Sequence, residues 1–180
     1  SRAVIGSFPD VRLIAANEQH FRQKYGPNVP MEMHGLIRSR DACFKSSALA
    51  IDLAKKYGTR LHVLHLSTRE EPALFEELPL NRKKITVEVC VHHLHFSEED
   101  YASKGTLIKC NPAVKTAQDR AALIEAVRSG RSDVVATDHA PHTEVDKHVE
   151  FGSAANGISG IETAAGIVLA AVWAGKLQLD

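Results

Sequence analysis

The sequence lacks an excess of charge of either sign, since its 180 residues carry 22 basic and 22 acidic side chains. A chain without a basic patch is not expected to bind nucleic acid or an acidic membrane surface. Long hydrophobic runs are also missing. The longest apolar segment, GIVLAAVWAG at residues 166–175, is too short to cross a bilayer, and the first residues do not read as a signal peptide. We therefore expect no nucleic-acid partner and no membrane partner.

Cysteine is scarce, and its placement is informative. Cys43, Cys90 and Cys110 are odd in number, lie far apart and form no C-x-x-C pair. This arrangement argues against a disulfide framework and against a thiolate zinc site. The three thiols are expected to be small buried hydrophobic groups in a reducing, cytoplasmic setting.

The apolar pattern predicts helices and strands in alternation. A hydrophobic content of 44% is typical of one soluble domain. Apolar residues at helical spacing, with Ser or Thr before them and Gly after them, predict helices, whereas short apolar, β-branched runs predict strands. Helices are expected at residues 11–25, 39–57, from 67 or 68 through 78, at 116–129 and at 160–174, and strands at residues 3–8, 60–66, 84–91, 106–110 and 134–136.

Strand then helix, repeated with strands that read as buried, is typical of a parallel α/β architecture. The run Val134, Val135, Ala136 is the clearest example of a strand expected to be fully buried. A closed (β/α)₈ barrel needs about 250 residues, so this chain can form only part of one. The alternative is a doubly wound sheet, but no glycine-rich phosphate loop follows any of the predicted strands.

Ionisable side chains follow three consecutive predicted strands. They are His65 in HVLHLST, His92 and His93 in VCVHHLH, and Asp138 in VVATDHAPH. Parallel strands end at one mouth of a barrel, where active sites lie, and imidazole and carboxylate groups suit a zinc-class ion. Two other interpretations stay open: Asp138 caps the segment after a solvated turn, and each histidine is a hydrogen-bonded core or rim residue. Because side chains alternate along a strand, His62 and His65 are expected on opposite faces, which leaves one of them for the site.

The motif ATDHAPH resembles the signature of dihydroorotases, within the cyclic amidohydrolase superfamily. RLHVLHLST, VEVCVHHLHF, KCNPAVKTAQDR and NGISGIET follow the order of that family, and the resemblance runs from about Arg38 to the C-terminus. It implies a partial (β/α)₈ TIM barrel of the metal-dependent amidohydrolase type with one or two zinc ions. Residues 1–180 would form one segment, the second half of the barrel with about strands five to eight. The implied reaction interconverts dihydroorotate and N-carbamoyl-L-aspartate in pyrimidine biosynthesis.

The resemblance also implies residue roles. His65 would be the sixth-strand metal ligand, and Asp138 the eighth-strand ligand that also carries a proton between the attacking water and the leaving amide nitrogen. Asn111 would contact the pyrimidine ring, and His142 would help to hold the substrate carboxylate. Gly157 lies in the loop 141–160, where backbone groups would meet the ring. His92 and His93 would orient the metal ligands or serve the structure.

Parts of the family pattern are missing. No first-strand H-x-H pair and no fourth-strand bridging lysine or aspartate occur, and Ser7 stands where the fifth-strand histidine is expected, with only Asp10 nearby. One interpretation is truncation: the chain is the second half of a longer enzyme, inactive when isolated, whose parent could be a homodimer. The second interpretation is a short non-catalytic relative that serves as a binding or assembly subunit. Hydantoinase and allantoinase activities are the alternative reactions.

Trp173 lies in the apolar closing helix, where it is expected to be a packed side chain.

Overall fold

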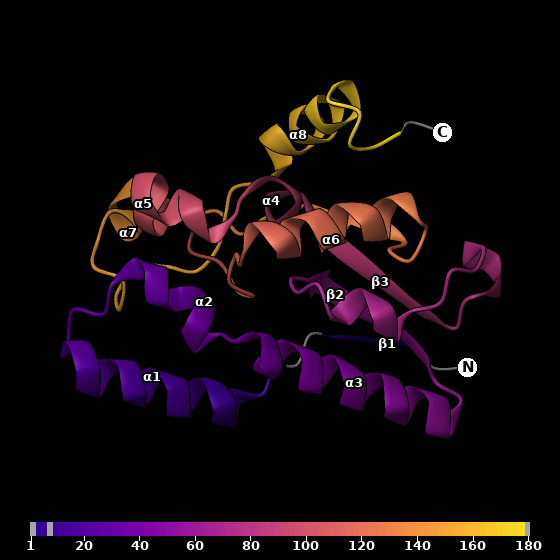
Figure 1. Ribbon diagram of the computed structural model, residues 1–180, viewed down its shortest axis with the longest axis horizontal. Helices are drawn as coiled ribbons and strands as arrows, with labels where there is room; N and C mark the ends of the chain where they lie inside the picture. Colours follow the sequence, from indigo (N-terminus) through magenta and orange to yellow (C-terminus); the bar gives the residue numbers. More distant parts are fainter. Residues whose placement is uncertain (1–2, 7–8, 179–180) are drawn as a thin grey trace.

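The computed structural model describes residues 3–6 and 9–178. Its centre is a four-stranded parallel sheet in the order β1-β2-β3-β4, which is also the order along the chain. Figure 1 labels β1, β2 and β3. The strands are β1 (Ala3–Gly6), β2 (Arg60–Leu66), β3 (Ile85–Cys90) and β4 (Val134–Ala136). Each strand pairs in parallel with the next one along the chain, and the connections from β1 to β2 and from β3 to β4 contain α-helices, whereas the connection from β2 to β3 contains only 3-10 turns. This order is that of part of a (β/α)₈ barrel, as predicted.

Three of the four long helices begin at capping side chains that the sequence displays, and the fourth, α8, begins after Gly160 without a side-chain cap. Helix α3 follows Ser39, whose hydroxyl accepts from the amide of Ala42. Thr116 and Asp119 form a reciprocal capping box at the start of α6. These local signals explain why the predicted positions of the long helices are confirmed within one or two residues. The long helices are α1 (Val11–Tyr25), α3 (Arg40–Tyr57), α6 (Ala117–Arg128) and α8 (Ile161–Trp173).

The main core lies on one face of the sheet. Leu61 and Val63 of β2 and Val87 and Val89 of β3 are buried there against α3 and α6. The other face carries His62, Thr86 and Glu88, a polar surface that corresponds to the inside of a barrel. The helices therefore cover the outer face and leave the inner face for the site.

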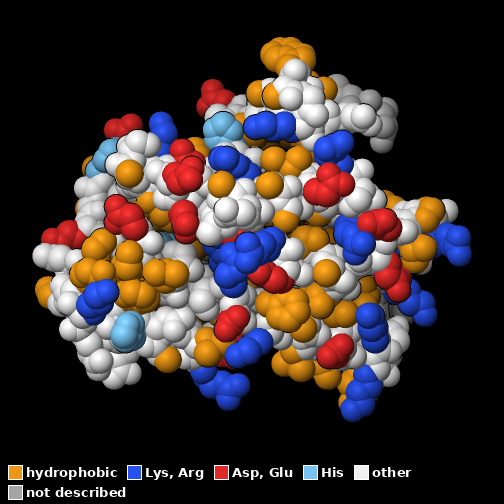
Figure 2. Space-filling model, in the orientation of Figure 1, with side chains coloured by type: hydrophobic (Ala, Val, Ile, Leu, Met, Phe, Trp, Pro, Cys, Tyr) orange, Lys and Arg blue, Asp and Glu red, His pale blue; other side chains and the backbone are white. Residues whose placement is uncertain are grey.

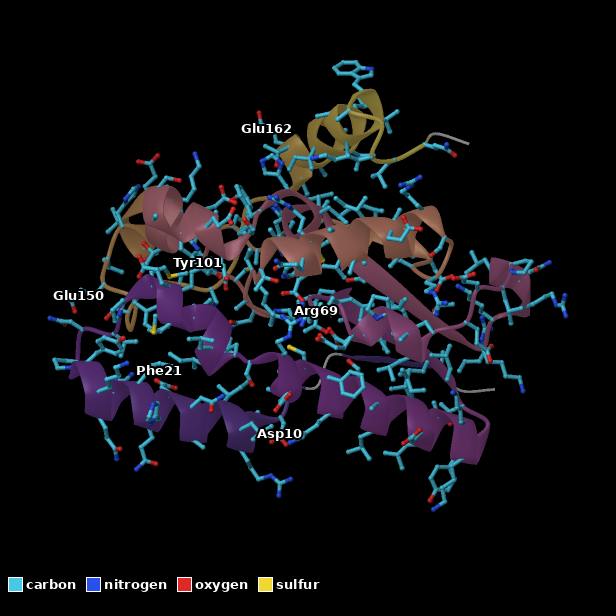
Figure 3. The ribbon with its side chains drawn as sticks, in the orientation of Figure 1. Asp10, Phe21, Arg69, Tyr101, Glu150 and Glu162 are labelled. Atoms are coloured by element: carbon cyan, nitrogen blue, oxygen red, sulfur yellow. The ribbon has the colours of Figure 1, made fainter. Side chains whose placement is uncertain are left out.

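An ion-pair network fixes the segment after β2 between two helices. Arg40 at the start of α3 donates to both carboxylate oxygens of Asp119 in α6, at 2.6 and 2.7 Å. The same carboxylate accepts from the backbone amide of Arg69 at 2.8 Å, and Arg69 lies between α3 and α6 in Figure 3. Because Arg69 follows the end of β2 by three residues, this network helps to hold the strand end where His65 lies.

The sheet edges correct one expectation from the sequence. The strand Val134–Ala136 was expected to be fully buried, yet Val134 and Val135 are 42% and 37% exposed. On the opposite edge, Ile5 of β1 is 68% exposed. Both strands are edge strands, and no further strand among the described residues pairs with their outer edges.

Helix α8 corrects a second expectation. It projects from the body of the molecule (Figure 1), contains no buried residue, and leaves Trp173 84% exposed instead of packed. Hydrophobic side chains are visible on its surface at the top of Figure 2.

Two predicted elements are wrong. The strand expected at residues 106–110 is a 3-10 turn, in which the amide of Lys109 bonds to the carbonyl of Thr106 instead of to a neighbouring strand. The helix expected through residue 78 is only a 3-10 turn at Glu71–Leu74, and Pro79 follows shortly after it. The remaining short elements are α2 (His34–Ile37), α4 (Val91–His95), α5 (Tyr101–Lys104), α7 (Glu144–Lys147) and 3-10 turns at Met31–Met33, Leu80–Arg82 and Glu98–Asp100.

The cysteine prediction is confirmed in part, because Cys43, Cys90 and Cys110 are all buried and free. Among the described residues, no helix is long and apolar enough to cross a membrane.

Candidate metal and substrate site

The candidate residues follow the carboxyl ends of neighbouring strands. His65 is the penultimate residue of β2, His92 and His93 lie in α4 directly after β3, and Asp138 comes two residues after β4. Since the three strands are parallel and adjacent, their ends lie along one edge of the sheet.

The backbone is unusual at two of these strand ends. Among the described residues other than glycine, only His65 (φ 37°) and Asp138 (φ 44°) have positive φ. Such conformations cost of the order of 1–3 kcal/mol and are concentrated at functional sites. The amide of His65 is held by the Glu88 carboxylate, with N to Oε1 at 3.3 Å.

The side chains of His62 and His65 have different surroundings. Both ring nitrogens of His62 are engaged, by Thr86 Oγ1 at 2.9 Å and by Glu88 Oε2 at 3.3 Å. His65 Nδ1 is buried and has no hydrogen-bond partner among the described residues. The prediction that His62 and His65 lie on opposite faces assumed regular alternation along the strand. This assumption does not hold at His65, because the β2–β3 register shifts between Val63 and Leu66. His65 is nevertheless the histidine that remains available as a ligand.

His92, after β3, lies near both His65 and Asp138, the candidates from the two neighbouring strands. Burial lowers its pKa to about 4, and the nearby Asp138 carboxylate opposes that shift while His65 adds to it. Both residues therefore lie within electrostatic range of the His92 ring. Asp138 itself is half-buried, and no described residue forms a hydrogen bond with its side chain in the structure.

Asn111 lies beside His65. The two residues share a hollow with Arg38 and Cys43. Asn111 Oδ1 is buried without a hydrogen-bond partner in the described part of the chain, and the bond from Asn111 to Pro112 is cis. A buried amide oxygen without a partner can accept a hydrogen bond from a bound molecule.

His142 and Gly157 lie together in the loop after β4. His142 Nε2 donates to the carbonyl of Asn156 at 3.0 Å. A Cβ added at Gly157, where φ is 146°, would lie 2.5 Å from the carbonyl oxygen of Ala140 and 3.1 Å from His142 Nε2. Only glycine allows these two stretches of backbone to approach so closely.

Two lysines that the sequence did not single out hold this loop. Lys147 Nζ is buried and donates to the carbonyls of Lys109, Ala155 and Gly157 at 2.8 to 3.0 Å. Lys109 Nζ donates to the carbonyls of Phe151 and Ala154, both at 2.6 Å, and burial lowers its pKa to about 8. Five carbonyls are thus fixed by two ammonium groups. The sequence offers one hint of this role, the lysine beside apolar residues in IKCNPAV. The carbonyls that this lysine binds lie about 40 residues further along the chain.

His139, next to Asp138, serves the start of α8. Its Nδ1 accepts from the amides of Gly160 and Ile161 at 3.1 and 3.3 Å. This contact leaves Asp138, rather than His139, as the group available for chemistry after β4. Ser7, where a metal ligand was expected, lies outside the described residues.

Comparison with known proteins identifies the relatives of this chain. No protein-family model matches the sequence. It is 44% identical over 118 residues to a dihydroorotase of a Thermoanaerobacter species, a match that covers 66% of this chain and 27% of that protein. A dihydroorotase of Carboxydothermus hydrogenoformans is 44% identical over 114 residues, 63% of this chain and 26% of that protein. Over these residues the chain is similar to dihydroorotases.

The resemblance to dihydroorotases is therefore confirmed, although the chain spans only about a quarter of the length of these curated relatives. The fold comparison agrees. An L-hydantoinase (dihydropyrimidinase) structure from Arthrobacter aurescens superposes with a TM-score of 0.90, covering 98% of this chain and 40% of that one at 24% identity. This likeness shows the shared fold alone, and it confirms the prediction that the chain forms part of a (β/α)₈ barrel.

Proposed function

We propose that the chain belongs to a zinc-dependent dihydroorotase that interconverts dihydroorotate and N-carbamoyl-L-aspartate in pyrimidine biosynthesis. In that enzyme the chain supplies the second half of the barrel, about strands five to eight. The observation that carries this proposal is the 44% identity to dihydroorotases over about two thirds of the chain. The hydantoinase structure is only 24% identical to the chain, so it supports the fold and says nothing about which ring is the substrate. A cytoplasmic location agrees with the three free cysteines.

The residues present fit a zinc-class ion. His65 offers a buried imidazole nitrogen that has no protein partner in the described structure, and Asp138 offers a carboxylate without a hydrogen-bonded partner there. Imidazole and carboxylate are ligands of catalytic zinc sites, which commonly use three protein ligands. His65 and Asp138 would supply two of them, and the further ligands would come from the remainder of the barrel.

The chemistry assigned to the chain concerns proton transfer and substrate positioning. When bound, zinc acidifies a water molecule and polarises the ring carbonyl. Asp138 accepts the proton of the attacking water and passes it to the leaving amide nitrogen, as a general base and then a general acid. Asn111 donates to or accepts from the ring, His142 binds the substrate carboxylate, and the backbone at Gly157 meets the ring edge. Lys109 and Lys147 keep that backbone in place.

A second candidate function is a non-catalytic amidohydrolase-like subunit that binds a partner. The observation in its favour is the exposure of apolar edge strands, such as Ile5 at 68% and Val134 at 42%. In a complete barrel these edges would be covered by the remaining strands, whereas in a subunit they would be covered by a partner. In either case the isolated chain is expected to be inactive.

The test is the substrate range of the full-length protein that contains these residues. Zinc-loaded protein is assayed with dihydroorotate, hydantoin and allantoin under identical conditions. The proposal predicts turnover of dihydroorotate that far exceeds turnover of the other two rings. Preferential turnover of hydantoin or allantoin would assign a related cyclic amidase, and no turnover of any ring would favour the binding subunit.

A further inference from the structure

The end of β3 carries a cluster of donor atoms that is separate from the pair His65 and Asp138. Cys90 is the last residue of β3, and α4, which carries His92 and His93, begins at the next residue. One ligand atom from each of the three residues lies within 4.8 Å of the others. Zinc ligands lie about 2.0–2.3 Å from the ion. Three donors this close can therefore surround one ion after small side-chain rotations.

The histidine nitrogens of this cluster that could bind an ion have no other partner among the described residues. His92 is 2% exposed and both of its ring nitrogens lack a hydrogen bond, and His93 Nδ1 is equally unpartnered at 3% exposure. A buried polar atom without a partner is costly, because it has lost its hydrogen bonds to water and gained none in return. A bound cation would remove this cost at two histidines at once.

The hydrogen bond of His93 fixes which nitrogen can bind. Nε2 lies 3.0 Å from the carbonyl oxygen of Pro112. Because a carbonyl can only accept, Nε2 carries the proton and the buried Nδ1 keeps a lone pair that no described residue uses. A histidine oriented by a backbone carbonyl in this way is typical of metal sites.

We propose that Cys90, His92 and His93 form a binding site for a zinc-class divalent cation. A thiolate and two imidazoles select ions such as Zn²⁺ over Mg²⁺ or Ca²⁺, which prefer oxygen ligands. Binding releases the thiol proton of Cys90 to solvent, so the thiolate and two neutral histidines leave the ion with one positive charge. The Asp138 carboxylate, whose charge acts on both Cys90 and His92, offsets that charge.

This site differs from the pair expected to serve catalysis. Among the described residues, Cys90, His92 and His93 are the only group of three or more potential ligands at mutual metal-binding distance, and neither His65 nor Asp138 belongs to it. The absence of a C-x-x-C motif had argued against a thiolate zinc site. That argument excludes paired thiolates, but it does not exclude one thiolate with two histidines brought together by a strand-to-helix turn.

The experiment is a cobalt(II) titration of the 180-residue chain, because cobalt replaces zinc and absorbs in the near ultraviolet when a thiolate binds it. We expect one cobalt per chain, a thiolate charge-transfer band, and release of about one proton per ion bound. Cys90→Ser and His92→Gln should each weaken binding by about tenfold or more, and Cys90→Ser should abolish the band. Circular dichroism of each variant verifies that it is folded.

Two control variants test whether the band comes from Cys90 and its two histidines. Cys43→Ser removes another buried cysteine and should leave the band intact. His65→Ala removes the expected catalytic ligand and should also leave it intact. The proposal is overturned if the wild-type chain shows no thiolate band, if the band survives in folded Cys90→Ser, or if it disappears in folded His65→Ala. Because the readout is metal binding, an absence of dihydroorotate turnover would not affect it.

Discussion

Lys83 Nζ lies 2.6 Å from Asp133 Oδ1, and the two side chains are only 1% and 4% exposed. The ammonium also donates to the carbonyl of Gly130 at 2.7 Å, and the other carboxylate oxygen accepts from the amide of Val87 at 2.9 Å. The pair thus connects the start of β3 with the turn before β4. It holds together two of the three strands whose ends form the candidate site.

Replacement of Lys83 by Met should strongly destabilise the fold, because it leaves the Asp133 carboxylate buried without its partner. The expected loss in the free energy of unfolding is about 3–5 kcal/mol, measured by urea denaturation. Arg128→Met is the matched control, since its partner Glu125 is 65% exposed and exposed pairs contribute about 0–1 kcal/mol. Equal effects of the two substitutions would show that the buried pair is not stabilising.

Gly157→Ala should distort the loop after β4. The new Cβ would lie 2.5 Å from the Ala140 carbonyl at a φ of 146°, and strain of this kind costs of the order of 1–3 kcal/mol. In the full-length enzyme we also expect KM for dihydroorotate to rise, because the shifted backbone would meet the ring. Gly152→Ala, where no atom lies within 4 Å of the added Cβ, should leave stability and KM nearly unchanged. Similar KM values for both variants would remove Gly157 from the substrate site.

The stability of the chain should fall as the solution becomes acidic. Burial lowers the pKa of His34 from 6.5 to about 3, while its Nε2 donates to the carbonyl of Cys110 at 2.8 Å. Between these two pKa values the unfolded chain binds a proton that the folded chain does not, so stability present above pH 6.5 is lost as the pH falls toward 3. This residue alone should contribute a loss of about 2 kcal/mol between about pH 7 and about pH 5.

The comparison of His34→Gln with wild type measures this contribution. The Gln side chain can still donate to the Cys110 carbonyl but does not titrate. The slope of the unfolding free energy against pH should therefore decrease by the amount that corresponds to about one bound proton. His20→Gln, at an exposed position, should leave the slope unchanged. A slope for His34→Gln that matches wild type would show that His34 does not titrate differently in the folded and unfolded chains.

The parts of the fold that the sequence predicted well depend on local signals. Helix α3 lies between Ser39, which caps it, and Gly58, which ends it in the left-handed conformation with φ 64°. The strand β2 and the ligand candidate His65 at its end were likewise visible in the run RLHVLHL. These features require only neighbouring residues, and a single sequence contains them.

The parts that the sequence failed to predict depend on distant contacts. Val134 looks like a core residue, yet its exposure depends on what lies beside β4. Lys147 holds the loop after β4 only because the carbonyls of Lys109 and Gly157 lie within 3.0 Å of its ammonium group. Sequence patterns describe periodicity, but they do not contain these tertiary distances.

The proposed enzymatic role depends most directly on Asp138. In the zinc-loaded, full-length protein, Asp138→Asn should lower kcat for dihydroorotate by about 10²- to 10⁴-fold, because the amide cannot accept the proton of the attacking water. Asp146→Asn is the control, since Asp146 lies in the same loop and only caps the short helix α7 through Thr143. The decisive measurement is the ratio of the two kcat values. We predict that Asp146→Asn retains nearly full turnover while Asp138→Asn is almost inactive, and near-normal turnover by folded Asp138→Asn would contradict the proposed function of the site.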